Sequence, residues 1–259
     1  MKTLKIQQKL EELGVKVSDI SLGHFDSIGE FTAKRNREPG NKLFDTVGAF
    51  YRSNYERGIL IYYLITTGNL DSFLEIGFGR GYATMCAAKA FADLGKTGRI
   101  TTIDPSLNRD YVQSLARIFP EEWFKGIVFV TDKSEDALPR VPEKFDLVYV
   151  DGDHRYDAVK RDWELLKDKW SRHILFDDYH LPTKKEEAIE CARAIDEIDE
   201  SQFDSHEKQL IKMDRRIFMD ERGYTDDQID YGQVLMTRKK PLVEESPEEA
   251  YVSEWLNDK

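Results

Sequence analysis

The chain has 259 residues, enough for one large α/β domain with extensions or for two small domains. Its net charge of −11 at pH 7 argues against nonspecific binding to nucleic acid, which needs a basic face. No apolar run reaches the roughly 18 residues of a membrane-spanning helix, and the first residues lack a signal-peptide core. The two cysteines, Cys86 and Cys191, suggest neither a disulfide scaffold nor a thiolate metal site. We therefore expect a cytoplasmic protein with neither nucleic acid nor membrane as a partner.

The first forty residues are polar and are interrupted by glycines, with a weak helical stretch at 4–13. They are interpreted as an N-terminal extension or lid (1–40), ahead of the main domain (41–240) and an acidic C-terminal tail (241–259). A helix is expected at 41–68, and its apolar face packs on a sheet or forms a wall of a pocket. The residues on that face are Leu43, Val47, Tyr51 and Tyr55.

The most informative stretch runs from an apolar strand into three alternating glycines, Gly77, Gly79 and Gly81, and then into a run of small apolar residues. A strand, a glycine turn and a helix open a nucleotide-binding α/β domain. The dinucleotide fingerprint G-x-G-x-x-G is not met, because the third glycine comes one position early and Tyr82 follows it. Glu75, two residues before the first glycine, would repel a pyrophosphate and favour a cation or an amino group. A tight turn without any ligand is the alternative.

Strand-like and helical segments alternate along the rest of the main domain, which predicts a parallel sheet with right-handed crossovers. The expected strands are 72–76, 99–104, 126–130, 145–151 and 173–176, followed by two more at 215–219 and 231–237. The expected helices are 82–94, 109–118, 155–170 and 184–200.

Acidic residues follow several of these strands, at the edge where a doubly wound sheet binds its ligands. Asp104 can hold ribose hydroxyls or serve as a turn residue. If the strands that precede them are neighbours, Asp151 and the pair Asp177-Asp178 lie about 5 Å apart. Three carboxylates that close need a partner, and oxygen ligands without cysteine suit Mg²⁺, Mn²⁺ or Ca²⁺. A loop start, or a site that binds an amino group without metal, is the alternative.

The pattern Glu-x-Gly-x-Gly resembles motif I of the class I S-adenosylmethionine-dependent methyltransferases. The resemblance extends over about 44–237. It implies a Rossmann-like, doubly wound, seven-stranded and mostly parallel α/β sheet with a final antiparallel strand. It also implies that S-adenosyl-L-methionine is bound, with the ribose at Asp104 and the adenine amino group near Asp132. The residues expected at the cofactor are Glu75, Gly77, Gly79, Gly81, Asp104, Asp132 and Asp151.

The phrase Asp151-Gly152-Asp153-His154 and the later pair Asp177-Asp178 resemble the metal-dependent small-molecule O-methyltransferases, such as catechol O-methyltransferase. The resemblance implies that Asp151, Asp177 and Asp178 hold Mg²⁺ or another divalent cation, and that a small hydroxylated molecule accepts the methyl group. His154 takes the place of a lysine of the catechol enzyme and is the first candidate for the general base. Asp153 is the second candidate, and His180 is either a third or a supporting residue.

Other functions remain open at this stage. A metal-free N-methyltransferase, a nicotinamide-dependent oxidoreductase and a non-catalytic nucleotide-binding protein share the same fold class. Glu75 and the missing third glycine argue against the oxidoreductase. The identity of the methyl acceptor is not encoded in any motif, and a homodimer is an expectation from the resemblance alone.

Overall fold

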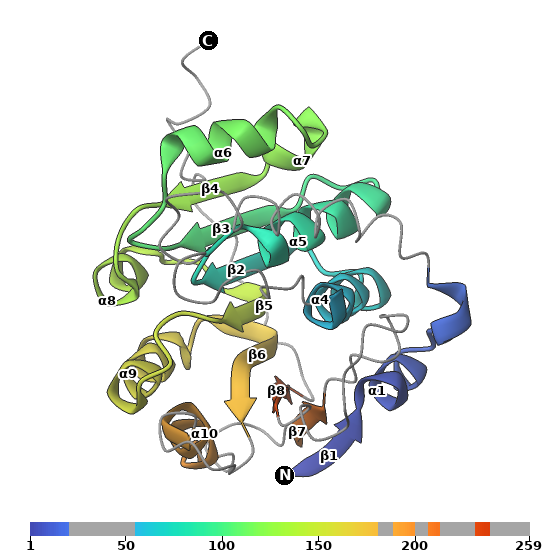
Figure 1. Ribbon diagram of the computed structural model, residues 1–259, viewed down its shortest axis with the longest axis vertical. Helices are drawn as coiled ribbons and strands as arrows, with labels where there is room; N and C mark the ends of the chain where they lie inside the picture. Colours follow the sequence, from blue (N-terminus) through green and yellow to red (C-terminus); the bar gives the residue numbers. More distant parts are fainter. Residues whose placement is uncertain (21–54, 181–188, 200–206, 213–230, 239–259) are drawn as a thin grey trace, which may run out of the picture.

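The computed structural model describes residues 1–20, 55–180, 189–199, 207–212 and 231–238. Within these ranges eight strands form one sheet in the order β1-β7-β8-β6-β5-β2-β3-β4 (Figure 1). The strands are β1 (Lys2–Lys5), β2 (Ser72–Ile76), β3 (Arg99–Ile103), β4 (Ile127–Val130), β5 (Phe145–Val150), β6 (Trp170–His180), β7 (Glu207–Lys212) and β8 (Tyr231–Thr237). The helices are α1 (Ile6–Glu12), α4 (Tyr55–Gly68), α5 (Tyr82–Asp93), α6 (Arg109–Ala116), α7 (Glu121–Phe124), α8 (Ser134–Ala137), α9 (Tyr156–Leu166) and α10 (Ile189–Asp196), with short 3₁₀ turns η1 (Val17–Asp19) and η3 (Leu138–Arg140).

The expected mostly parallel sheet with a final antiparallel strand is confirmed. Strands β2 to β6 pair in parallel, whereas β8 runs antiparallel to both β6 and β7. The predicted number of seven strands is wrong, because β1 adds an eighth strand in parallel to β7, with Leu4 opposite Ile211. A four-residue strand rich in lysine has too few apolar positions to show a period of two, so the sequence pattern missed it.

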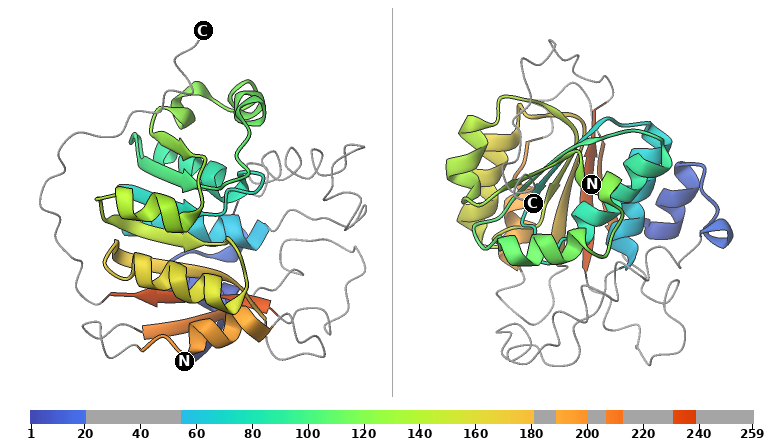
Figure 2. Two further views of the ribbon diagram at one scale, coloured as in Figure 1. Left: turned by 90° about the vertical axis from the view of Figure 1, so that its left-hand side faces the viewer. Right: turned by 90° about the horizontal axis from the view of Figure 1, so that it is seen from above.

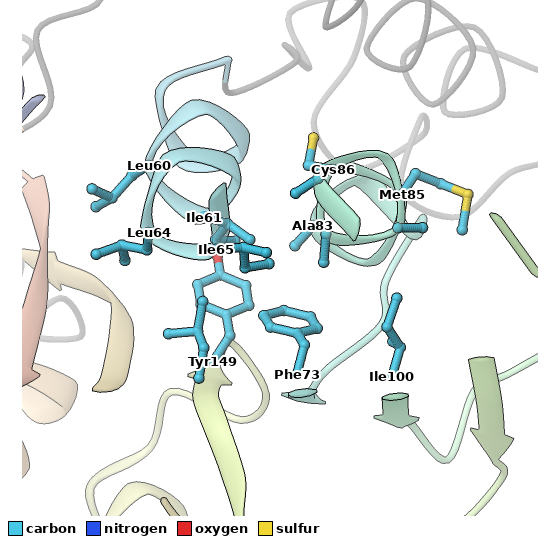
Figure 3. Packing of buried hydrophobic residues seen from close by; sticks show 14 of the residues in the cluster. Leu60, Ile61, Leu64, Ile65, Phe73, Ala83, Met85, Cys86, Ile100 and Tyr149 are labelled. Atoms are coloured by element: carbon cyan, nitrogen blue, oxygen red, sulfur yellow. The ribbon is translucent and has the colours of Figure 1, made fainter. Parts of the chain in front are cut away.

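Helices cover both faces of the sheet, as the view from above shows (Figure 2). Alternate residues of a strand point to opposite faces, so Phe73 joins the core beneath α4 and α5, and Leu74 joins the core beneath α9 and α10. Figure 3 shows Phe73 and Tyr149 on neighbouring strands, beside Ile61 and Ile65 of α4. The carboxyl ends of the buried strands β2 and β5 therefore lie at one edge of the sheet.

Two elements of the structure differ from the prediction within the described residues. Trp170 begins β6 instead of ending the preceding helix, which stops at Leu166. A strand at 207–212 was not predicted, because its sequence, Glu-Lys-Gln-Leu-Ile-Lys, has only two apolar residues. The strand predicted at 215–219, the first part of the helix predicted at 41–68 and the acidic tail lie outside the described residues. None of the described helices is both long and apolar enough to span a bilayer.

Candidate active site

The three glycines between β2 and α5 all have left-handed backbone conformations. Their φ angles are +94° at Gly77, +52° at Gly79 and +77° at Gly81, which is also the residue that precedes the first turn of α5. Residues with a Cβ rarely adopt such angles. The sharp turn that the sequence predicted is therefore present, and it needs glycine for its backbone conformation.

The space around each glycine differs. A Cβ at Gly77 would lie 2.1 Å from the carbonyl oxygen of Asp151, and one at Gly81 would lie 2.5 Å from the ring of Phe78. A Cβ at Gly79 would have no atom within 4 Å, and this residue is exposed. Packing therefore explains the first and third glycines, whereas the open side of Gly79 lets a ligand approach the backbone.

Residues after β3 stabilise the glycine turn through hydrogen bonds. The backbone N–H of Gly79 donates a hydrogen bond of 2.9 Å to Oδ2 of Asp104, while Oδ1 accepts one of 2.7 Å from the N–H of Ser106. The hydroxyl of Tyr111 donates to the carbonyl of Arg80 over 2.9 Å. Both oxygens of Asp104 retain a lone pair, because a carboxylate oxygen accepts two hydrogen bonds. Asp104 thus lies beside the open Gly79, and the ribose contact expected of it stays a prediction.

Glu75 lies inside the sheet instead of facing solvent. Its side chain is buried, and Oε2 accepts hydrogen bonds from the hydroxyls of Thr84 and Thr102. Burial raises the pKa of Glu75 to about 8, the two threonine hydrogen bonds oppose this rise, and the charge of Asp104 adds to it. Glu75 therefore links α5 and β3 to β2, and its direct contact with a cofactor stays a prediction.

Replacing Glu75 with glutamine is expected to change how stability depends on pH. The pKa of Glu75 rises from 4.5 to about 8 on folding, so its favourable contribution is present at low pH and is lost as the pH rises from 4.5 to 8. Relative to Glu75→Gln, the wild type should lose on the order of 1.4 kcal/mol of unfolding free energy per pH unit in that window. Urea denaturation of both proteins between about pH 5 and 8 measures this difference, and parallel curves would contradict it.

Asp132 follows β4 and forms an ion pair with Arg140, which lies in η3. Both side chains are largely exposed. The next hydroxyl, that of Ser134, donates a hydrogen bond of 2.5 Å to the buried Asp162 of α9. The loop after β4 is therefore fixed to the neighbouring helix, and the adenine contact expected of Asp132 stays a prediction.

The predicted acid cluster is present: Asp151 directly follows β5, and Asp177 and Asp178 lie within β6, where the pairing of β6 with β8 is irregular. Strands β5 and β6 are parallel neighbours, with Val150 opposite Phe176, so Asp151 and Asp177 follow at the same level. The guanidinium of Arg57, from α4, reaches all three acids. Its nitrogens lie 3.4 Å from Asp151, 2.7 Å from Asp177 and 2.6 Å from Asp178.

Asp177 faces the interior of the molecule. Its side chain is fully buried, and besides Arg57 it accepts hydrogen bonds from the Tyr149 hydroxyl, at 2.5 Å, and from Nε2 of Gln233, at 3.3 Å. Burial raises the pKa of Asp177, and the charge of Arg57 opposes this rise. Each oxygen of Asp177 contacts a protein donor and the side chain is fully buried, which leaves Asp177 poorly placed as an open metal ligand.

Asp178 turns the other way. Its φ of +51° is a left-handed conformation that is unusual for a residue other than glycine. This conformation brings Oδ2 to 3.3 Å from Nε2 of His154. Ligand atoms of Asp151, His154 and Asp178 all lie within 4.8 Å of one another. In the part of the chain that the structure describes, His154 thus stands where the sequence placed Asp177 in the candidate metal set.

The two candidates for the general base have different surroundings. Asp153 accepts hydrogen bonds from the side chain and the backbone N–H of Arg155, and these lower its pKa to about 2. A carboxylate with so low a pKa is a weak base. His154 is 47% exposed and lies beside Asp178, which makes it the better-placed candidate. The backbone of His180 ends β6, and its side chain lies outside the described residues.

Arg57, Tyr149 and Gln233 were not predicted as site residues. One signal for Arg57 existed, since it is the only lysine or arginine in the helix 55–68, whose remaining residues are mainly apolar. Tyr149 and Gln233 lie inside strands, where an aromatic and an amide residue look like ordinary packing positions.

Comparison with known proteins shows what the chain is similar to. Residues 74–179 match a family described as a methyltransferase domain. The fold is similar to that of the O-methyltransferase TomG from Streptomyces achromogenes in complex with SAM, with a TM-score of 0.58, 17% identity, and coverage of 82% of this chain and 90% of TomG. An O-methyltransferase from Bacillus cereus in complex with SAH gives a TM-score of 0.57 and 13% identity, over 90% of this chain and 97% of that one.

Identities this low establish a shared fold and no more, and no curated protein matches the sequence significantly. The matched segment nevertheless contains the glycine turn, Asp104, Asp151 and the pair Asp177-Asp178. Residues 74–179 are therefore similar to a methyltransferase domain, and the chain shares the Rossmann-like fold of these two O-methyltransferases.

Proposed function

We propose that the chain transfers the methyl group of S-adenosylmethionine to a hydroxyl oxygen of a small molecule, with help from a divalent cation. One observation carries the proposal: the glycine turn and the acid cluster adjoin each other. The backbone N–H of Asp151 donates a hydrogen bond of 2.8 Å to the carbonyl of Ile76, the residue before Gly77. A methyl donor on the glycine turn and an acceptor at the acids would therefore meet at one sheet edge.

The residues at the sheet edge fit a divalent cation. Asp151 and Asp178 are partly exposed, at 22% and 25% of their side chains, and each offers a carboxylate oxygen within 4.8 Å of the other. Mg²⁺ is commonly held by one or two carboxylates and keeps further positions for water or substrate. A cation bound there would lower the pKa of an acceptor hydroxyl.

The remaining steps fall to side chains of this chain. Asp104 and the open backbone of Gly79 would hold the cofactor, as their geometry allows. His154 would accept the proton of the acceptor hydroxyl, because its Nε2 lies at the outer side of Asp178 and imidazole is an effective base near neutral pH. Asp177 and Arg57 would support Asp151 and Asp178 from beneath.

A methyl-transfer assay tests the proposal. The protein is incubated with labelled S-adenosylmethionine and a panel of catechols, phenols, sugars and amines, with Mg²⁺ or with EDTA. We expect methylation of a hydroxylated compound that EDTA abolishes and Mg²⁺ restores. Turnover of an amine that EDTA does not affect would favour the rival metal-free N-methyltransferase. Binding of S-adenosylhomocysteine without turnover of any compound would favour a non-catalytic protein.

Replacing His154 with glutamine distinguishes its two possible roles, metal ligand and general base, since the lone pair on Nε2 either coordinates a cation or accepts a proton. As the base, His154→Gln should lower kcat by about 10²- to 10⁴-fold and leave Mn²⁺ affinity within roughly threefold. Turnover kinetics and Mn²⁺ binding by electron paramagnetic resonance measure the two effects. A large loss of Mn²⁺ affinity would make His154 a ligand instead.

Three further expectations belong to this proposal. They are a cytoplasmic location, the absence of nucleic acid as a partner, and a homodimer. Sedimentation of the purified protein would reveal the homodimer.

A further inference from the structure

Arg57 contacts all three acids of the cluster. It comes from the first turn of α4, far in sequence from the strands that carry the acids. Its side chain is only 19% exposed, and it contacts Asp177 through Nε and Asp178 through Nη2. Arginine stays protonated in proteins, so it brings a permanent positive charge to this place.

The contacts divide the acids into two groups. Asp177 points inward, where Arg57, Tyr149 and Gln233 occupy its oxygens. Asp151 and Asp178 reach the surface, and their contacts with Arg57 use one oxygen each, Oδ2 of Asp151 and Oδ1 of Asp178. The second oxygen of Asp178, Oδ2, lies 3.3 Å from Nε2 of His154.

We propose that Arg57 is an internal cation that keeps Asp177 from binding metal and reduces the negative charge of the cluster to one that suits a divalent ion. The three carboxylates carry a formal charge of −3, and Arg57 reduces it to −2, the charge that one divalent cation neutralises. This inference deepens the proposed function and rests on it. Arg57 is a positioning residue in this scheme, since it acts through the acids and not on the reacting atoms.

A direct consequence is that Arg57 weakens the binding of the metal that it helps to select. Its positive charge lies a few ångströms from the carboxylates that would hold the cation, and like charges at that distance repel strongly where water is partly excluded. Removing the charge should therefore raise metal affinity, whereas a residue needed only for folding would lower it or leave it unchanged.

The test compares Mn²⁺ binding, measured by electron paramagnetic resonance, for four proteins. Arg57→Gln should bind Mn²⁺ at least about tenfold more tightly than the wild type. Arg57→Lys keeps the charge and should stay within roughly threefold, and the control Arg193→Gln, which removes an exposed arginine of α10, should do the same. Calorimetry with S-adenosylhomocysteine shows in each case that the cofactor site is intact.

A second variant covers the case in which Arg57→Gln fails to fold, because it leaves Asp177 buried without its cation. The double variant Arg57→Gln/Asp177→Asn restores the formal charge of −2 and should return Mn²⁺ affinity to within roughly threefold of the wild type. A folded Arg57→Gln that binds Mn²⁺ no more tightly than the wild type overturns the inference alone, and so does a double variant whose Mn²⁺ affinity departs from that of the wild type by more than roughly threefold. If no variant binds Mn²⁺ although each binds S-adenosylhomocysteine, the cation in the proposed function fails as well. Binding by Arg57→Gln but not by the wild type supports Arg57 as the internal cation and removes the metal from the wild-type reaction.

Discussion

Gly77→Ala is expected to abolish binding of S-adenosylhomocysteine and to destabilise the domain by several kcal/mol, because the new methyl group would meet a backbone atom. The carbonyl oxygen of Asp151 would lie 2.1 Å from the added Cβ, and the φ of +94° is strained for alanine. That oxygen cannot move aside without disturbing the pairing of β2 with β5. Thermal unfolding and calorimetric titration measure both effects.

Gly79→Ala tests cofactor binding without the steric clash expected for Gly77→Ala. Its φ of +52° costs alanine about 1–2 kcal/mol, and no atom lies within 4 Å of the new Cβ. We expect a folded protein whose affinity for S-adenosylhomocysteine falls at least about tenfold. Gly95→Ala is the matched control, since Gly95 also has a left-handed φ, of +68°, and open space, but lies beyond the far end of α5. Equal affinities of the Gly79 and Gly95 variants would contradict a cofactor on the open side of the turn.

Asp151→Asn is expected to cause the largest loss at the acid cluster. The amide keeps the shape of the side chain but removes one of the two negative charges that face outward. Cation affinity should fall by more than about 100-fold, beyond the usual effect of a residue that only supports a ligand, and kcat by about 10²-fold or more. Mn²⁺ titration and single-turnover methyl transfer at saturating S-adenosylmethionine measure the two losses.

A matched control is Asp157→Asn, which removes an exposed carboxylate from the first turn of α9. It changes the net charge of the protein by the same amount and should leave Mn²⁺ affinity within roughly twofold, because exposed charges are screened by salt. Full cation affinity in Asp151→Asn would show that the acids at this sheet edge have another use.

The sequence predicted the central part of the fold because its strands are continuous apolar runs with clear ends. The bounds 72–76 are those of β2, and β3 and β5 each end one residue before the predicted position. The edge of the sheet was harder to predict. Strands β1 and β7 contain few apolar residues. They pair with each other although they lie about two hundred residues apart in the chain. Such segments are strands because of this long-range pairing, which a local sequence pattern does not reveal.

The candidate site divides in the same way. The strand ends predicted that Asp151, Asp177 and Asp178 come together, since neighbouring parallel strands place their ends at one edge. The sequence could not predict which acid faces outward, because the left-handed backbone of Asp178 decides this. Nor could it predict Arg57, which reaches the cluster only because α4 packs over β5. The sequence equally could not predict that Asp177 is a buried partner of Arg57 in the structure.

The hydrogen bond between Asp151 and Ile76 joins the two halves of the site through the main chain. A displacement of the glycine turn when one ligand arrives must therefore shift the backbone that carries the acid for the other. Thermodynamic linkage requires the influence to be mutual, so each ligand alters the affinity for its counterpart by the same factor. An enzyme built this way can show heterotropic cooperativity between donor and acceptor without any movement of domains.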